Sequence, residues 1–110
     1  MISIPIKPLS VNDAWQGRRY KTKKYIKYEK DCNLMLPNYV KIPEGLLQIY
    51  LEFGLSSFGG DVDNPVKPIT DILSKKYDFN DNRIIKQTAL KVKVKKGQEY
   101  IKFRIEKWEG

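Results

Sequence analysis

A strict alternation of apolar and polar residues over positions 47–53 constrains the fold of this chain more than any other feature. The apolar positions are Leu47, Ile49, Leu51 and Phe53, and the polar positions between them are Gln48, Tyr50 and Glu52. Successive side chains of an extended strand point to opposite faces, so this pattern predicts a strand with one buried face. The chain must therefore build a β-sheet and cover one side of it.

Two other segments have the spacing of amphipathic helices. The first predicted helix has an apolar stripe that runs from Tyr25 to beyond Met35, and Pro37 stops it. A second helix is predicted over positions 69–77, where apolar residues recur three and four positions apart. Asn64 is expected to cap the start of this second helix.

The remaining alternating segments complete the predicted sheet. Ile2–Ile6 contains a proline and is expected to be an edge strand. Positions 89–95 and 100–107 also alternate, and the Lys-Gly-Gln sequence at 96–98 predicts a hairpin turn between them. The expected fold class is α+β, with a mixed β-sheet packed against two main helices in a single domain over residues 1–110.

Composition restricts the available chemistry. The chain has no histidine, which excludes imidazole general bases, Ser-His-Asp triads and histidine metal ligands. Cys32 is the only cysteine, so neither an intramolecular disulfide nor a thiolate zinc cage can form. Any chemistry must therefore use carboxylates, lysine or a metal ion.

A group of acidic residues runs against the net charge of +8. Asp61 and Asp63 precede Lys67, and Asp81 follows within Asn80-Asp81-Asn82. If positions 61–63 form extended backbone, both aspartates point to one face, where their oxygens can bind a hard divalent cation. A basic protein that gathers acid at one point suggests a metal-dependent nuclease, whose positive surface binds phosphates.

Each of these residues also has a simpler structural interpretation. An Asp-x-Asp sequence is common at turns and helix starts, and Asp81 alone would fit a turn. Lys67 could be one more solvated lysine. Asp71, on the second predicted helix, is expected to be only a surface charge.

The order of these elements resembles the RusA family of Holliday junction resolvases. The shared features are Asp-x-Asp-Asn-x-x-Lys at 61–67, a helix, a turn with Asn-Asp at 80–81 and a final Lys-Gly hairpin. The resemblance extends from about Ser10 to the end of the hairpin. It implies a small homodimer that uses Mg²⁺, with Mn²⁺ as its substitute, to cut four-way DNA junctions.

The resemblance also implies roles for individual residues. Asp61, Asp63 and Asp81 would bind the metal and act in catalysis, and Lys67 would be the essential catalytic lysine. Asn64 would be the motif asparagine and belong to the DNA-binding residues. Dimerisation would also suit a short chain with a high ratio of surface to core.

A basic segment lies within a predicted polar loop over positions 9–24. Its five cations are Arg18, Arg19, Lys21, Lys23 and Lys24. With Tyr20 and Tyr25 beside them, they are expected to bind DNA phosphates and to stack on unpaired bases. A solvated lysine-rich face is the alternative, and the same two interpretations apply to the lysines at 91, 93 and 95.

Two other functions remain open at this point. A non-catalytic nucleic-acid-binding protein would explain the charge, and a magnesium nuclease that cuts flaps or other branched DNA would explain the acids. No organic cofactor or membrane partner is expected. The start of the chain lacks the charged region of a signal peptide, and no apolar run reaches the ~20 residues of a membrane span, so we expect a cytoplasmic protein of a bacterial or phage-infected cell.

Overall fold

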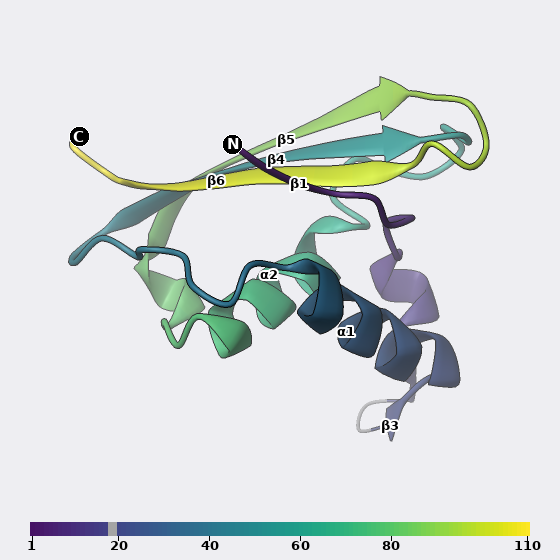
Figure 1. Cartoon of the computed structure of the whole chain (residues 1–110), viewed down its shortest axis with the longest axis horizontal. Coiled ribbons are helices and arrows are strands. Elements are labelled where there is room, and N and C mark those ends of the chain that lie inside the picture. Colours follow the sequence, from purple (N-terminus) through teal and green to yellow (C-terminus); the bar gives the residue numbers. More distant parts are fainter. Residues whose placement is uncertain (18–19) are drawn as a thin grey trace.

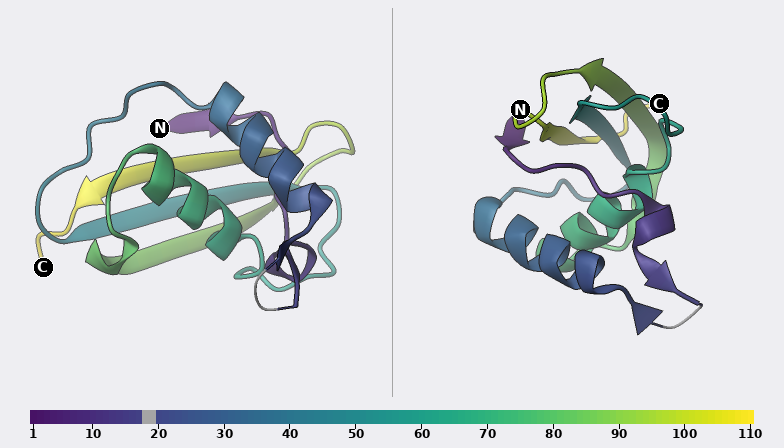
Figure 2. Two further views of the ribbon diagram at one scale, coloured as in Figure 1. Left: turned by 90° about the horizontal axis from the view of Figure 1, so that it is seen from below. Right: turned by 90° about the vertical axis from the view of Figure 1, so that its right-hand side faces the viewer.

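The computed structural model describes residues 1–17 and 20–110, which form two layers. A four-stranded sheet forms one layer, and two helices pack against one of its faces (Figure 1). Figure 2 shows both helices on that face from two further directions. The predicted α+β class, with a mixed sheet and two helices, is confirmed.

The sheet has the strand order β1-β6-β4-β5. Its strands are β1 (Ile2–Ile4), β4 (Leu47–Leu55), β5 (Ile84–Lys93) and β6 (Tyr100–Lys107). β4 pairs with β5 in parallel and with β6 in antiparallel orientation. The alternating segment at 47–53 therefore becomes a central strand, and its apolar side chains are buried against the helices.

The predicted hairpin between the last two strands is wrong. β5 and β6 lie on opposite sides of β4 and do not pair with each other. The connection between them passes the end of β4, where the Val94 N–H donates to the Leu55 carbonyl at 2.9 Å. Alternation shows which residues of a strand share a face, but it carries no information about the strand's neighbours. The strongly apolar β4 takes the central position, where it has a partner on both edges.

The helix α1 (Lys23–Met35) begins and ends close to the predicted positions. The Thr22 hydroxyl accepts the Tyr25 N–H at 3.1 Å and so caps its start. Tyr25 is buried as expected, but Met35 is 44% exposed and does not join the apolar stripe. The last buried apolar position of this segment is Leu36, just beyond the helix.

The helix α2 (Val66–Lys76) connects β4 to the parallel strand β5. Its N-cap is Pro65, which makes no side-chain capping bond, so the predicted capping role of Asn64 is wrong. Pro68 is accommodated because it lies in the first turn, where a helix N–H has no partner within the helix. Both prolines are buried, so they also contribute to packing.

The predicted polar loop at 9–24 contains ordered structure. It includes the short 3-10 helix η1 (Val11–Asp13) and a small two-stranded sheet of β2 (Trp15–Gln16) and β3 (Tyr20–Lys21). Thr22 ties this region together, because its hydroxyl donates to the Asp13 carbonyl at 2.6 Å. Across the described parts of the chain, neither helix is long and apolar enough to cross a bilayer.

Candidate functional site

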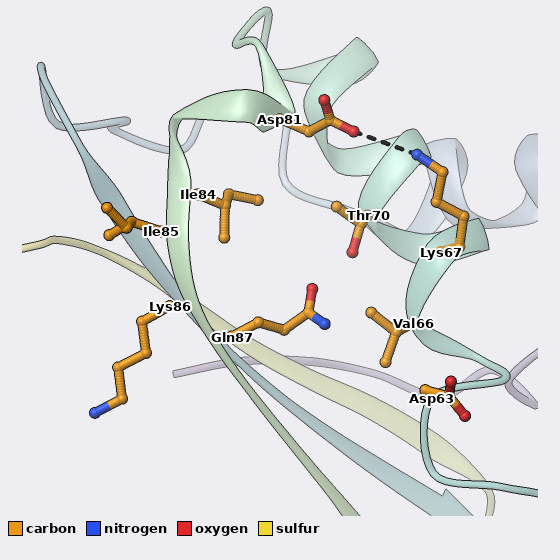
Figure 3. A pocket seen from close by; sticks show the side chains of 9 residues that line it. All are labelled: Asp63, Val66, Lys67, Thr70, Asp81, Ile84, Ile85, Lys86 and Gln87. Atoms are coloured by element: carbon orange, nitrogen blue, oxygen red, sulfur yellow. Dashed lines mark hydrogen bonds and ion pairs between the residues drawn. The ribbon is translucent and has the colours of Figure 1, made fainter.

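A cavity of about 480 Å³ lies between α2 and the first half of β5 (Figure 3). Its polar lining comes from Asp63, Lys67, Thr70, Asp81, Lys86 and Gln87, and its apolar lining includes Val66 and Ile84. Figure 3 shows Asp63 at one end of the cavity and Asp81 at the other, with Thr70 and Gln87 between them. Three of the four predicted catalytic residues therefore line one cavity.

Asp81 is held by a well-anchored turn. It begins the 3-10 helix η2 (Asp81–Arg83), immediately before β5. Asn80 caps this turn by accepting the Asn82 N–H at 3.0 Å. Arg83 fixes the turn to the segment before β4, because its guanidinium donates to the carbonyls of Gly45 (2.8 Å) and Pro43. The carboxylate of Asp81 is thereby kept at one end of the cavity.

Lys67 lies between two carboxylates. Its ammonium is 2.9 Å from Asp71 Oδ1, one helical turn further along α2, and 3.3 Å from Asp81 Oδ2. Hydrogen bonds and charge attraction from Asp71, and then from Asp81, raise the pKa of Lys67 above its ordinary value. Lys67 is therefore a cation throughout the physiological pH range, and Asp71 is more than the isolated surface charge that the sequence suggested.

The segment that contains Asp61 and Asp63 is a turn, so it lacks the extended backbone on which a shared face for the two aspartates depended. The Asn64 N–H donates to the Asp61 carbonyl, and the Val66 N–H donates to the Asp63 carbonyl, both at 3.1 Å. Aspartate and asparagine favour such turns, and the fixed φ of Pro65 favours the chain reversal. Period-two alternation does not apply in a turn, so the two aspartates need not share a face.

The turn sends Asp61 to a different surface from Asp63. Asp61 lines an adjoining groove of about 390 Å³, together with Ser10 and Asn64. The Asn64 carbonyl accepts the Val11 N–H at 2.8 Å, which joins this turn to η1. Within residues 1–17 and 20–110, no three acidic or cysteine side chains gather into a ready-made set of metal ligands. Asp61 stands apart from the other two predicted ligands in this conformation.

Thr70 is a cavity residue that sequence reasoning did not find. It is 6% exposed, and its hydroxyl has no hydrogen-bond partner among the described residues. A buried hydroxyl without a partner is uncommon in folded proteins and calls for a structural reason. The available signal was a threonine between the apolar residues Ile69 and Ile72, on the buried side of an amphipathic helix.

Asp78 has a backbone role. It is the one described residue other than glycine with a positive φ, at 53°. The Phe79 N–H donates to the Ser74 carbonyl at 3.0 Å, so Asp78 is the left-handed residue of a Schellman motif that ends α2.

The basic segment is described only in part, because Arg18 and Arg19 lie outside the described residues. Lys21 is paired with Glu29 at 2.9 Å and lies over the Tyr25 ring, 5.3 Å from its centroid. Lys23 and Lys24 are exposed in the first turn of α1. These two lysines are the described cations of the segment best placed to meet a phosphate.

The two tyrosines of this segment differ in exposure. Tyr25 is 2% exposed and packs edge-to-face against Trp15, with ring centroids 5.6 Å apart. It cannot stack on a base, so that expectation is wrong for Tyr25. Tyr20 is 73% exposed and remains available.

Lys91 and Lys93 stabilise the loop that leads to Asp61. They pair with Phe53 and Leu55 of β4, so they lie on the helix side of the sheet. The Lys91 ammonium donates to the Gly60 carbonyl at 2.8 Å, and that of Lys93 donates to the Ser56 carbonyl. These two lysines have an intramolecular role that alternation alone did not predict.

No protein-family model matches this chain, and no curated protein matches it significantly. Its function must therefore be inferred from the residues of the cavity and from the charge around it.

Proposed function

We propose that this protein is a magnesium-dependent, structure-selective endodeoxyribonuclease of the RusA type, which resolves four-way DNA junctions by paired incision. The observation that carries the proposal is that Asp63, Lys67 and Asp81, from separate parts of the chain, line one cavity. The net charge of +8 supports a polyanionic substrate, because a net positive charge attracts phosphates through long-range electrostatics.

The donor atoms of the cavity suit Mg²⁺. This ion prefers oxygen ligands and is usually bound by one or two carboxylates, while waters and substrate phosphates complete its shell. Asp63 or Asp81 could each supply such a carboxylate, and Asp61 is close by in sequence on the turn that precedes α2. When bound, Mg²⁺ would supply Lewis acidity toward a phosphate oxygen and toward water.

The other cavity residues would position the DNA strand. The Lys67 ammonium can offset negative charge that develops on the scissile phosphate in the transition state. The apolar side chains of Val66 and Ile84 form part of the cavity wall beside these polar groups. No histidine is present, so no imidazole takes part in proton transfer.

The DNA arms would bind outside the cavity. Lys23 and Lys24 can contact phosphates from the start of α1, and Tyr20 can stack on an unpaired base. Arg18 and Arg19 belong to the same basic segment and would add phosphate contacts.

We further propose that the protein acts as a homodimer. A four-way junction has two-fold symmetry, which a symmetric dimer with one catalytic set in each subunit would match. Mixed dimers of wild-type and Asp63→Asn subunits should then bind a junction normally and make mainly single nicks. Sedimentation of a monomer at working concentration, with paired incision retained, would contradict this arrangement.

The test of function is cleavage of a labelled four-way junction, a matched linear duplex and a flap, each with and without Mg²⁺. Paired cuts in the junction alone, dependent on Mg²⁺ and absent in Asp63→Asn, are expected. Preferred cutting of the flap would indicate the broader branched-DNA nuclease. Tight junction binding without any cutting would leave a non-catalytic DNA-binding protein.

A further inference from the structure

Lys67 is shared between two carboxylates that differ in their surroundings. Asp71 lies on the same helix and forms the shorter contact, at 2.9 Å. Asp81 lies on the separate turn η2 and forms the longer contact, at 3.3 Å, which Figure 3 marks with a dashed line. The ammonium therefore already occupies one side of the Asp81 carboxylate.

This arrangement has a consequence for any cation that binds to Asp81. Two positive charges within a few ångströms of the same carboxylate repel each other, so an incoming cation and the Lys67 ammonium compete for Asp81. With Asp81 as its sole partner, Lys67 would move into solvent as the cation bound. Asp71 offers a second partner on α2, and the short contact can persist while the Asp81 contact opens.

We infer that Asp71 is a positioning residue, which keeps the Lys67 ammonium at the cavity edge when a divalent cation binds to Asp81. The inference deepens the proposed function and rests on it for the identity of the cation. Asp71 would act only through Lys67 and would bind neither metal nor DNA itself.

The chain contains a matched control for this ion pair. Lys27 and Asp31 on α1 have the same spacing of four residues, with nitrogen and oxygen 2.6 Å apart. The side chain of Asp31 is 32% exposed, as is that of Asp71. Lys27 and Asp31 line a different cavity, so Asp31→Asn changes the net charge equally without touching Lys67.

The experiment is a double-mutant cycle that measures Mn²⁺ affinity by calorimetry without DNA. It compares wild-type protein with Asp71→Asn, Lys67→Gln and the double variant. Asp71→Asn should weaken Mn²⁺ binding about two- to fivefold, the range that a partly exposed ion pair supplies, because Lys67 then pairs with Asp81 alone. Lys67→Gln should strengthen binding by removing the competing cation.

The double variant decides the result. If Asp71 acts through Lys67, Asp71→Asn must cost less than half as much Mn²⁺-binding free energy in the Lys67→Gln background as it does in the wild-type background. An equal loss in both backgrounds would show that Asp71 acts directly on the metal, and it would overturn the inference. The inference would also be overturned if the wild-type protein bound no Mn²⁺. It would likewise be overturned if Asp31→Asn weakened Mn²⁺ binding as much as Asp71→Asn does.

Cleavage measured in the same variants separates this inference from the proposed function. Asp71→Asn should lower kcat with little change in KM for the junction. When it is added to the Lys67→Gln variant, it should not lower kcat further. If the Asp71→Asn and Lys67→Gln effects on Mn²⁺ affinity are coupled but the protein cuts no DNA, the nuclease is refuted and the role of Asp71 stands. If the protein cuts the junction but the two effects on Mn²⁺ affinity are independent, only the role of Asp71 is refuted.

Discussion

Replacing Lys23 and Lys24 together by alanine should weaken junction binding without destabilising the protein. Both side chains are exposed in the first turn of α1, and no acidic residue lies in that turn. A cation at a helix N-terminus faces the positive end of the helix dipole, which costs about 0.3–1 kcal/mol. Removing the pair should therefore leave the free energy of unfolding unchanged or raise it by about 1 kcal/mol.

The effect on binding follows from counterion release. Each lost phosphate contact lowers the slope of log affinity against log salt by about 0.9, so two lost contacts lower it by about 1.8. Between about 50 and about 200 mM salt, the affinity ratio of wild-type to variant should then fall about tenfold. Lys21→Ala should change the slope by less than 0.9, because Glu29 already pairs with that ammonium.

The assay is fluorescence anisotropy with a labelled junction at several salt concentrations, without Mg²⁺ so that no cutting occurs. Urea unfolding gives the stability of each variant. Lys75→Ala is the control, because Lys75 lies in the last turn of α2, where a cation is favourable. Lys75→Ala should lower the free energy of unfolding by about a few tenths of a kcal/mol and leave the salt dependence of junction binding unchanged. An unaltered slope in the Lys23 and Lys24 variant would show that these lysines form a merely solvated face.

Four further substitutions test the site and the sheet. Asp63→Asn or Asp81→Asn should abolish junction cleavage while junction binding is kept or strengthened. Each change removes an oxygen ligand and a charge that repels phosphates. Near-wild-type turnover at saturating Mg²⁺ would show that the residue is not a metal ligand. Gly54→Ala should lower the free energy of unfolding in urea by about 1–3 kcal/mol, because its Cβ would lie 2.3 Å from a ring carbon of Tyr100; unchanged stability would contradict this packing. Glu52→Gln should cost about 1–2 kcal/mol at neutral pH, because the carboxylate accepts the Tyr100 hydroxyl at 2.5 Å. That hydrogen bond lowers the pKa of Glu52, so its contribution is present above the unfolded pKa and is lost as the pH falls through the lower folded pKa; a difference between wild type and variant that persists in strong acid would contradict the assignment.

Local periodicity was enough to predict the individual elements. The alternation at 47–53 identified β4 and its buried face, and the helical spacing identified α1 and α2. Each of these patterns records which side of one element is apolar, and burial of that side is the main favourable term in folding. The α+β class follows from the elements alone.

The pairing of the strands needed the tertiary structure. β5 and β6 alternate as a hairpin would, yet each pairs with β4. The sequence of a strand specifies which of its residues share a face, whereas its neighbours depend on contacts between segments far apart in the chain. The same alternation did not predict that Lys91 would lie beside Phe53 on the helix side of the sheet.

The candidate site shows the same division. Residue types and spacing singled out Asp63, Lys67 and Asp81, and the fold brings these three to one cavity. The sequence did not predict the turn at 61–66, which places Asp61 in a separate groove. It also did not predict the contact of Asp71 with Lys67. Both depend on where α2 starts relative to the loop before it and to η2, and packing across the whole domain sets that position.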